Sequence, residues 1–127
     1  MNIDIVELQK GCRATCVIIQ DEDVKELKPI VAIKANISNK SLFCDSAPNF
    51  AAKISEKSEN NDICYLAILG IDTLSESEQN KFVPLVKDRY MNNYSLPENC
   101  IIVFTVKDKN ALKKISPELY HFAIVAF

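Results

Sequence analysis

The sequence predicts an α/β fold: a three-layer αβα sandwich in which helices cover both faces of a five-stranded, mainly parallel sheet. Apolar runs alternate with segments of helical character along all 127 residues, which we interpret as a single domain. Residues 63–72, ICYLAILGID, are apolar almost throughout, as is typical of a central strand buried on both faces of a parallel sheet. Ser75 and Glu78 then form a capping-box pattern, so a helix is expected to begin directly after this strand.

The other expected elements follow from local patterns. Apolar, β-rich runs predict the remaining strands at residues 13–20, 41–45, 100–106 and 121–127. Helices are expected at residues 23–36, from Ala47-Pro48-Asn49 onward, at 76–90 and at 111–115, with a further turn at Ser116-Pro117-Glu118 and a loop at 92–99. The first of these helices is predicted by apolar residues at helical spacing: Val24, Leu27, Val31 and Ala35. Pro29 lies inside it and should bend it or move its start.

Charge and composition exclude several classes of partner. The chain has 15 basic and 17 acidic residues, a net charge of −2, and no long block of one sign, so neither nucleic acid nor an anionic membrane is an expected partner. No segment approaches the roughly 20 apolar residues of a membrane helix, and residues 1–10 are too polar for a signal peptide. These features predict a cytoplasmic protein.

The cysteines do not predict a metal site. Five are scattered along the chain, mostly in apolar runs, which indicates small buried side chains in a reducing compartment. Cys12 and Cys16 are closely spaced, but no second such pair exists and His121 is the single histidine. Structural zinc takes four ligands in paired short spacings, so no metal is expected.

The sequence also lacks the glycines of a phosphate-binding loop. Its two glycines, Gly11 and Gly70, lie far apart, whereas such a loop needs several so that backbone N–H groups can approach a phosphate closely. Where the loop would fall, between the first strand and the first helix, the chain reads Gln20-Asp21-Glu22-Asp23. Three acids at a helix start would repel a triphosphate, and ordinary helix capping explains them.

Several motifs in the second half of the chain nevertheless occur in the order found in one ATPase family. They are Leu69-Gly70-Ile71-Asp72, Ser75 with Gln79-Asn80, Asp88-Arg89, Leu96-Pro97-Glu98-Asn99, Thr105-Val106-Lys107, and Ile115-Ser116-Pro117-Glu118-Leu119 ahead of His121-Phe122. From residue 62 onward the chain resembles the second half of an AAA+ ATPase core, closest to the MoxR-like branch. The resemblance implies a P-loop NTPase-like arrangement of the sheet and a protein that works as an oligomer.

The departures from the family pattern fall on its catalytic positions. The metal-binding aspartate of the family corresponds to Leu69 and its water-activating glutamate to Gly70. The asparagine that senses the γ-phosphate corresponds to Lys107, and the arginine before phenylalanine corresponds to His121. Neither Leu69 nor Gly70 offers the oxygen ligands that Mg²⁺ requires, so we expect no catalytic residue, no metal and no cofactor.

The sequence therefore predicts a non-catalytic, nucleotide-independent AAA+-like domain without a helical lid, a pseudo-ATPase that acts through self-association or docking on a protein partner. The residues left at the vestigial pocket are Gln20, Asp21, Asp72, Thr105 and Lys107. Asp72 is expected to cap the following helix together with Ser75, and Arg89 to complement the dipole at that helix's end.

Two alternatives stay open. One is a diverged NTPase that still binds ATP or ADP through Asp72, Thr105 and Lys107, because anion binding at a helix start does not strictly require glycine. The other is a receiver-like signalling domain in which Asp72 is the phosphorylated residue. Thr105 and Lys107 lie on one predicted strand rather than on two, which fits a receiver poorly.

Overall fold

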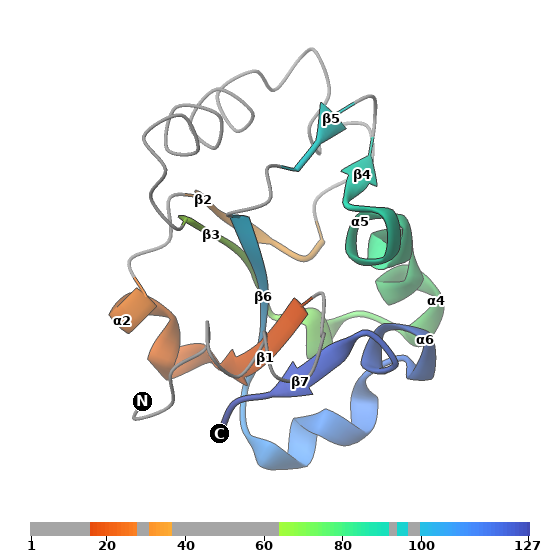
Figure 1. Ribbon diagram of the computed structural model, residues 1–127. Coiled ribbons are helices and arrows are strands. Elements are labelled where there is room, and N and C mark those ends of the chain that lie inside the picture. The colour runs from red at the N-terminus through yellow and green to blue at the C-terminus, as the bar shows by residue number, and fades with distance from the viewer. Residues whose placement is uncertain (1–15, 28–30, 37–63, 92–93, 97–99) are drawn as a thin grey trace.

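The computed structural model describes residues 16–27, 31–36, 64–91, 94–96 and 100–127. Within these ranges five strands form one sheet, in the order β2-β3-β6-β1-β7, and every pair is parallel. The strands are β1 (Cys16–Gln20), β2 (Val31–Lys34), β3 (Cys64–Leu69), β6 (Cys100–Val106) and β7 (Ala123–Val125). The predicted α/β fold is confirmed (Figure 1). The strand expected at 41–45 and the helix expected after it lie outside the described residues.

Helices cover both faces of the sheet (Figure 1). Within a strand, successive side chains point to opposite faces, so each face has its own apolar core. One face packs against the short helix α2 (Val24–Leu27), which follows the 3₁₀ turn η1 (Asp21–Asp23). The other face packs against residues 76–88, which form α4 (Glu76–Gln79), η3 (Asn80–Phe82) and α5 (Val83–Asp88), and against η4 (Lys109–Lys114) and α6 (Pro117–Tyr120). In β1, Cys16 and Ile18 join this second core, whereas Val17 and Ile19 join the first.

The middle of the sheet is β6, not β3. Residues 63–72 were expected to form the central strand, but β3 ends at Leu69, and β6 lies between β3 and β1. All seven residues of β6 are buried. Both runs are strongly apolar, so composition alone does not distinguish the middle strand from its neighbour.

The prediction of one helix over residues 23–36 is wrong. Helical structure ends at Leu27, and Val31–Lys34 is the strand β2, parallel to β3. Pro29 has no N–H to donate, and a proline disfavours helical geometry in the residue before it. From Ala32 to Asn36 exposed and buried residues alternate, with Ile33 and Ala35 buried, as in a strand.

The helix expected at 76–90 is interrupted and shorter. The 3₁₀ turn η3 separates α4 from α5, and α5 ends at Asp88. Pro84 cannot donate the hydrogen bond that an α-helix would require to the carbonyl of Asn80, so the chain tightens there. After the helix, β4 (Tyr90–Met91) pairs antiparallel with β5 (Tyr94–Ser95), a hairpin that the prediction of a loop at 92–99 missed.

The capping box at the start of α4 is confirmed. The Ser75 hydroxyl accepts a hydrogen bond from the backbone N–H of Glu78 at 3.3 Å, and it donates to Glu78 Oε1 at 2.9 Å. The backbone N–H of Ser75 also donates to Glu78 Oε1 at 3.3 Å. These bonds from Ser75, the hydroxyl first, lower the pKa of Glu78 from its ordinary value of 4.5.

This arrangement makes the stability of the helix start depend on pH. Since Glu78 stays ionised to lower pH in the folded state than in the unfolded state, its contribution is complete above pH 4.5 and is lost as the pH falls through the lowered pKa. We expect Glu78→Ala to lower the thermal midpoint at pH 7, and the difference from the parent to shrink below pH 4.5. The exposed Glu76 serves as the control position. A midpoint difference that stays constant down to about pH 3 would contradict the role given to the carboxylate.

Within the described ranges, no helix is both long and apolar enough to cross a membrane.

Candidate functional site

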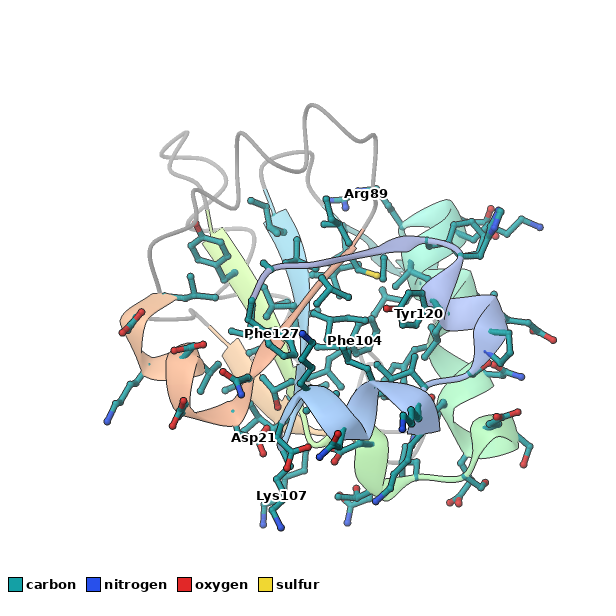
Figure 2. All side chains as sticks on the ribbon, turned by 90° about the horizontal axis from the view of Figure 1, so that it is seen from below. Asp21, Arg89, Phe104, Lys107, Tyr120 and Phe127 are labelled. Carbon is teal, nitrogen blue, oxygen red and sulfur yellow. The ribbon has the colours of Figure 1, made fainter. Side chains whose placement is uncertain are left out.

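The candidate site lies at the carboxyl edge of the sheet. It is beside the switch point, where the connections that follow two neighbouring strands run in opposite directions along the sheet. From β1 the chain passes through α2 to β2, on one side of β1, whereas from β6 it passes through η4 and α6 to β7, on the other side. Because the connections leave on opposite faces, the ends of β1 and β6 flank the place where open α/β sheets bind ligands. Figure 2 shows Asp21 and Lys107 together at this end of the molecule and Arg89 at the opposite end.

The β1–α2 connection contains no loop. Gln20 is the last residue of β1 and is half-buried, and the helical turn η1 begins at the next residue, Asp21. Asp21 and Glu22 are exposed and Asp23 is half-buried. The three acids were expected to cap the helix, but they form its first turn, and no side chain caps it.

The end of β3 is tied to β6 through a side chain. The Thr105 hydroxyl is fully buried and accepts a hydrogen bond from the backbone N–H of Gly70 at 2.9 Å. Gly70 has φ of +74°, the left-handed region in which glycine is favoured, and the 3₁₀ turn η2 (Ile71–Thr73) follows it. Thr105 therefore has a structural role at the edge of the site, in holding the turn after β3.

Asp72 and Lys107 are brought together, but through the backbone. Asp72 lies within η2, half-buried, and its Oδ2 accepts a long hydrogen bond of 3.5 Å from the backbone N–H of Lys107. The side chain of Lys107 is exposed. The expectation that Asp72 caps α4 is wrong: Ser75 is the cap, and Asp72 links η2 to the end of β6.

A cavity of about 340 Å³ opens beside these residues, between α2 and the ends of β2 and β3. Of the five predicted pocket residues, only Asp21 lines it. Lys34, Ala35 and Asn36 were not expected here, because residues 23–36 were predicted to form a helix instead of the strand β2. The lining residues come from three segments: Asp21 and Val24; Lys34, Ala35 and Asn36; Leu69, Gly70 and Thr73.

Two motifs that carry the family resemblance form one hydrogen-bonded network away from this edge. Gln79 is fully buried; its Nε2 donates to the carbonyl oxygens of Leu74 at 3.0 Å and Lys114 at 2.7 Å, and its Oε1 accepts from the N–H of Ser116 at 2.6 Å. The Ser116 hydroxyl also contacts Oδ1 of Asn80. The Gln-Asn and Ser-Pro motifs thus join α4 and η3 to α6, a structural task that needs no ligand.

The remaining candidates also have structural contacts. Arg89 directly follows α5 and has φ of +54°, and its guanidinium donates to the carbonyl of Cys100 at 2.6 Å, at the amino end of β6. His121 directly follows α6 and is exposed, so it is not the strand residue that was expected. The Cys16 thiol contacts the carbonyl of Phe122 at 3.6 Å, and burial raises its pKa to about 12. A thiol with so high a pKa is a poor nucleophile and a poor metal ligand.

In the part of the chain that the structure covers, no three or more His, Cys, Asp or Glu side chains are arranged so that they could hold a metal ion. Cys12 lies outside that part. Comparison with models of known protein families gives no match, and no curated protein matches the chain significantly.

Proposed function

We propose that this chain is a non-catalytic, nucleotide-independent AAA+-like domain that acts through protein contact, in the first instance with further copies of itself. The observation that carries the proposal is the direct passage from β1 into η1. A phosphate loop wraps a nucleotide with the backbone of several residues between strand and helix, and here Gln20 is followed at once by helical Asp21.

Charge at this turn supports the same conclusion. A nucleotide phosphate placed at the start of η1 would face the carboxylates of Asp21, Glu22 and Asp23. Two like charges at about 4 Å repel by about 1 kcal/mol even in bulk water, and more near a protein surface. The first turn offers no cation against them; Lys25, in the last turn of α2, is exposed.

The chemistry at the end of β3 points the same way. Where the AAA+ ATPases that the sequence resembles carry acids for Mg²⁺ and for the attacking water, this chain has Leu69 and Gly70, and the Gly70 N–H donates to the Thr105 hydroxyl. Asp72, the acid nearest in sequence, accepts a hydrogen bond from the Lys107 backbone. These contacts stabilise the sheet edge, and Leu69 and Gly70 supply neither the metal ligand nor the base that phosphoryl transfer needs at these two positions.

A surface suited to protein contact lies on α5 and α6. A groove of about 420 Å³ runs between them, lined by Val83, Lys87, Pro117, Glu118, His121 and Phe122. Tyr120, in the same helix α6, is a large apolar side chain with 41% of its surface exposed. An apolar groove with charged residues at its rim, and a partly exposed tyrosine nearby, are typical of protein interfaces.

Nucleotide binding is the property that tests this proposal. The thermal midpoint is measured alone, with millimolar Mg-ATP and with millimolar Mg-ADP. A ligand at 100 times its dissociation constant adds about 2.7 kcal/mol, which for a domain of this size raises the midpoint by several degrees. We expect no rise with either nucleotide.

A clear rise with Mg-ATP or Mg-ADP would contradict the proposal. The variant Asp72→Asn then identifies the site: loss of the rise in this variant would indicate a diverged NTPase that uses Asp72. Incubation with Mg²⁺ and acetyl phosphate is a third arm, in which labelling of the parent but not of Asp72→Asn would indicate a receiver-like domain instead.

A further inference from the structure

We propose that the cavity at the carboxyl ends of β2 and β3 binds a small zwitterion with an apolar side group, of which an α-amino acid is the simplest, with its ammonium group beside Asp21 and its carboxylate beside Lys34. This inference goes beyond the proposed function, which concerns nucleotide and protein partners. The two proposals are independent, because a domain can act through protein contact whether or not it also binds a small molecule.

The position of the cavity favours a ligand. It lies at the carboxyl edge of a parallel sheet, where α/β proteins bind small molecules, and three separate segments of the chain line it. Strand pairing fixes two of these segments relative to each other: Lys34 of β2 pairs with Leu69 of β3, and the N–H of Ala35 donates to the carbonyl of Leu69 at 2.9 Å. The opposite wall comes from Asp21 and Val24 at the start of the helical layer.

The lining divides into an apolar part and a polar rim. Val24, Ala35 and Leu69 supply apolar surface, with Ala35 buried and the other two half-buried. The exposed side chains Asp21, Lys34, Asn36 and Thr73 supply the rim. This combination accommodates a ligand whose apolar side group contacts the apolar lining and whose charged groups lie at the polar rim.

The rim carries two opposite charges. Among the described residues, no hydrogen bond or ion pair involves the Asp21 carboxylate or the Lys34 ammonium group. The Thr73 hydroxyl already donates to the carbonyl of Gly70 at 2.6 Å, so it is left as an acceptor. A carboxylate and an ammonium group on the walls of one cavity match a ligand that carries both charges.

Size and charge together narrow the ligand class. A volume of about 340 Å³ is at the lower end of the range for small-molecule sites, so the ligand is small. One positive and one negative side chain give no net attraction for a phosphate, and Asp21 repels it. An uncharged apolar molecule would leave both rim charges unused.

L-Leucine is the probe, titrated into the ¹⁵N-labelled protein and followed by the amide chemical shifts of residues around the cavity. We expect saturable shifts near Gly70 and Ala35, with a dissociation constant of about 1 mM for so small a ligand at an open site. Leucinamide, which lacks the carboxylate, and 4-methylpentanoate, which lacks the ammonium group, should each bind about fivefold more weakly, since each loses one exposed ion pair.

Matched variants assign the two charges. Asp21→Asn should weaken L-leucine about fivefold while leaving 4-methylpentanoate unchanged, and Lys34→Met should weaken L-leucine while leaving leucinamide unchanged. Glu22→Gln and Lys107→Met are the controls, because these residues are exposed but do not line the cavity. All four substituted side chains are exposed, so the fold should be retained, and the thermal midpoint checks this.

Three outcomes would overturn the inference. They are the absence of shifts with L-leucine at about 20 times the expected dissociation constant, control variants that weaken binding as much as the cavity variants do, and binding of adenosine in place of the amino acid. The first two outcomes leave the proposed function unaffected, whereas binding of adenosine would also argue against it. The effect of Mg-ATP and Mg-ADP on the thermal midpoint tests that function separately.

Discussion

Gln79→Leu is expected to lower the free energy of unfolding by about 3–5 kcal/mol, because it removes the amide that joins α4 to η4 and α6. Leucine fills a similar volume but cannot accept the Ser116 N–H or donate to the carbonyl oxygens of Leu74 and Lys114. Gln79 is fully buried and its bond from the Ser116 N–H is buried too, so water does not reach that N–H without opening the structure. Each orphaned buried group costs about 1–3 kcal/mol.

Urea unfolding measures this cost, and Glu76→Leu is the matched control. Glu76 is exposed in the same short helix, so its replacement should change stability by less than about 0.5 kcal/mol. The two carbonyl partners on one side of the amide and the N–H partner on the other also fix its orientation, since a flipped amide would oppose like groups. A Gln79→Leu variant as stable as the parent would show that the network contributes nothing.

Phe82→Ala is expected to cost about 3–5 kcal/mol through the cavity that it leaves between the helical layer and the sheet. Phe82 is fully buried on η3 and meets Phe104 of β6 edge to face, with ring centroids 5.8 Å apart and planes at 65°. Such a pair adds about 0.5–1.5 kcal/mol to the burial of the rings. Since β6 is the middle strand, this contact anchors residues 76–88 to the centre of the sheet.

Val83→Ala, at the next residue, is the control for Phe82→Ala: comparing the two losses in free energy of unfolding isolates the contribution of packing. Val83 is half-buried at the groove, so its truncation should cost much less than that of Phe82. Phe82→Leu should fall between the two, because it keeps part of the volume but loses the aromatic contact. Equal losses for Phe82→Ala and Val83→Ala in the same urea series would contradict the packing described.

The parts of the fold that the sequence predicts are those with a local cause. The capping box needs only Ser75 and Glu78, and the run in β6 is apolar enough to require burial on both faces. At Val31–Lys34 the local patterns conflict, because helical spacing from Val24 and strand alternation around Ile33 both fit. Pairing with β3 decides between them, and that contact is not visible in a local window.

The candidate site was predictable only in part, for the same reason. The residues after β1, β3 and β6 could be assigned to one sheet edge, but the cavity also needs β2, whose position depends on that long-range pairing. The burial of Gln79 was predictable from the sequence, because Gln79 lies three residues before Phe82 and so falls on the apolar side of the helix. A polar residue at such a position indicates a buried hydrogen-bond network.

The central claim is that protein contact by this domain does not depend on nucleotide, and molar mass measured by light scattering over a range of concentrations tests it most directly. We expect one curve of mass against concentration, rising above the 14.3 kDa of a single chain and unchanged by millimolar Mg-ATP. A curve that shifts to larger mass only when Mg-ATP is added would contradict it.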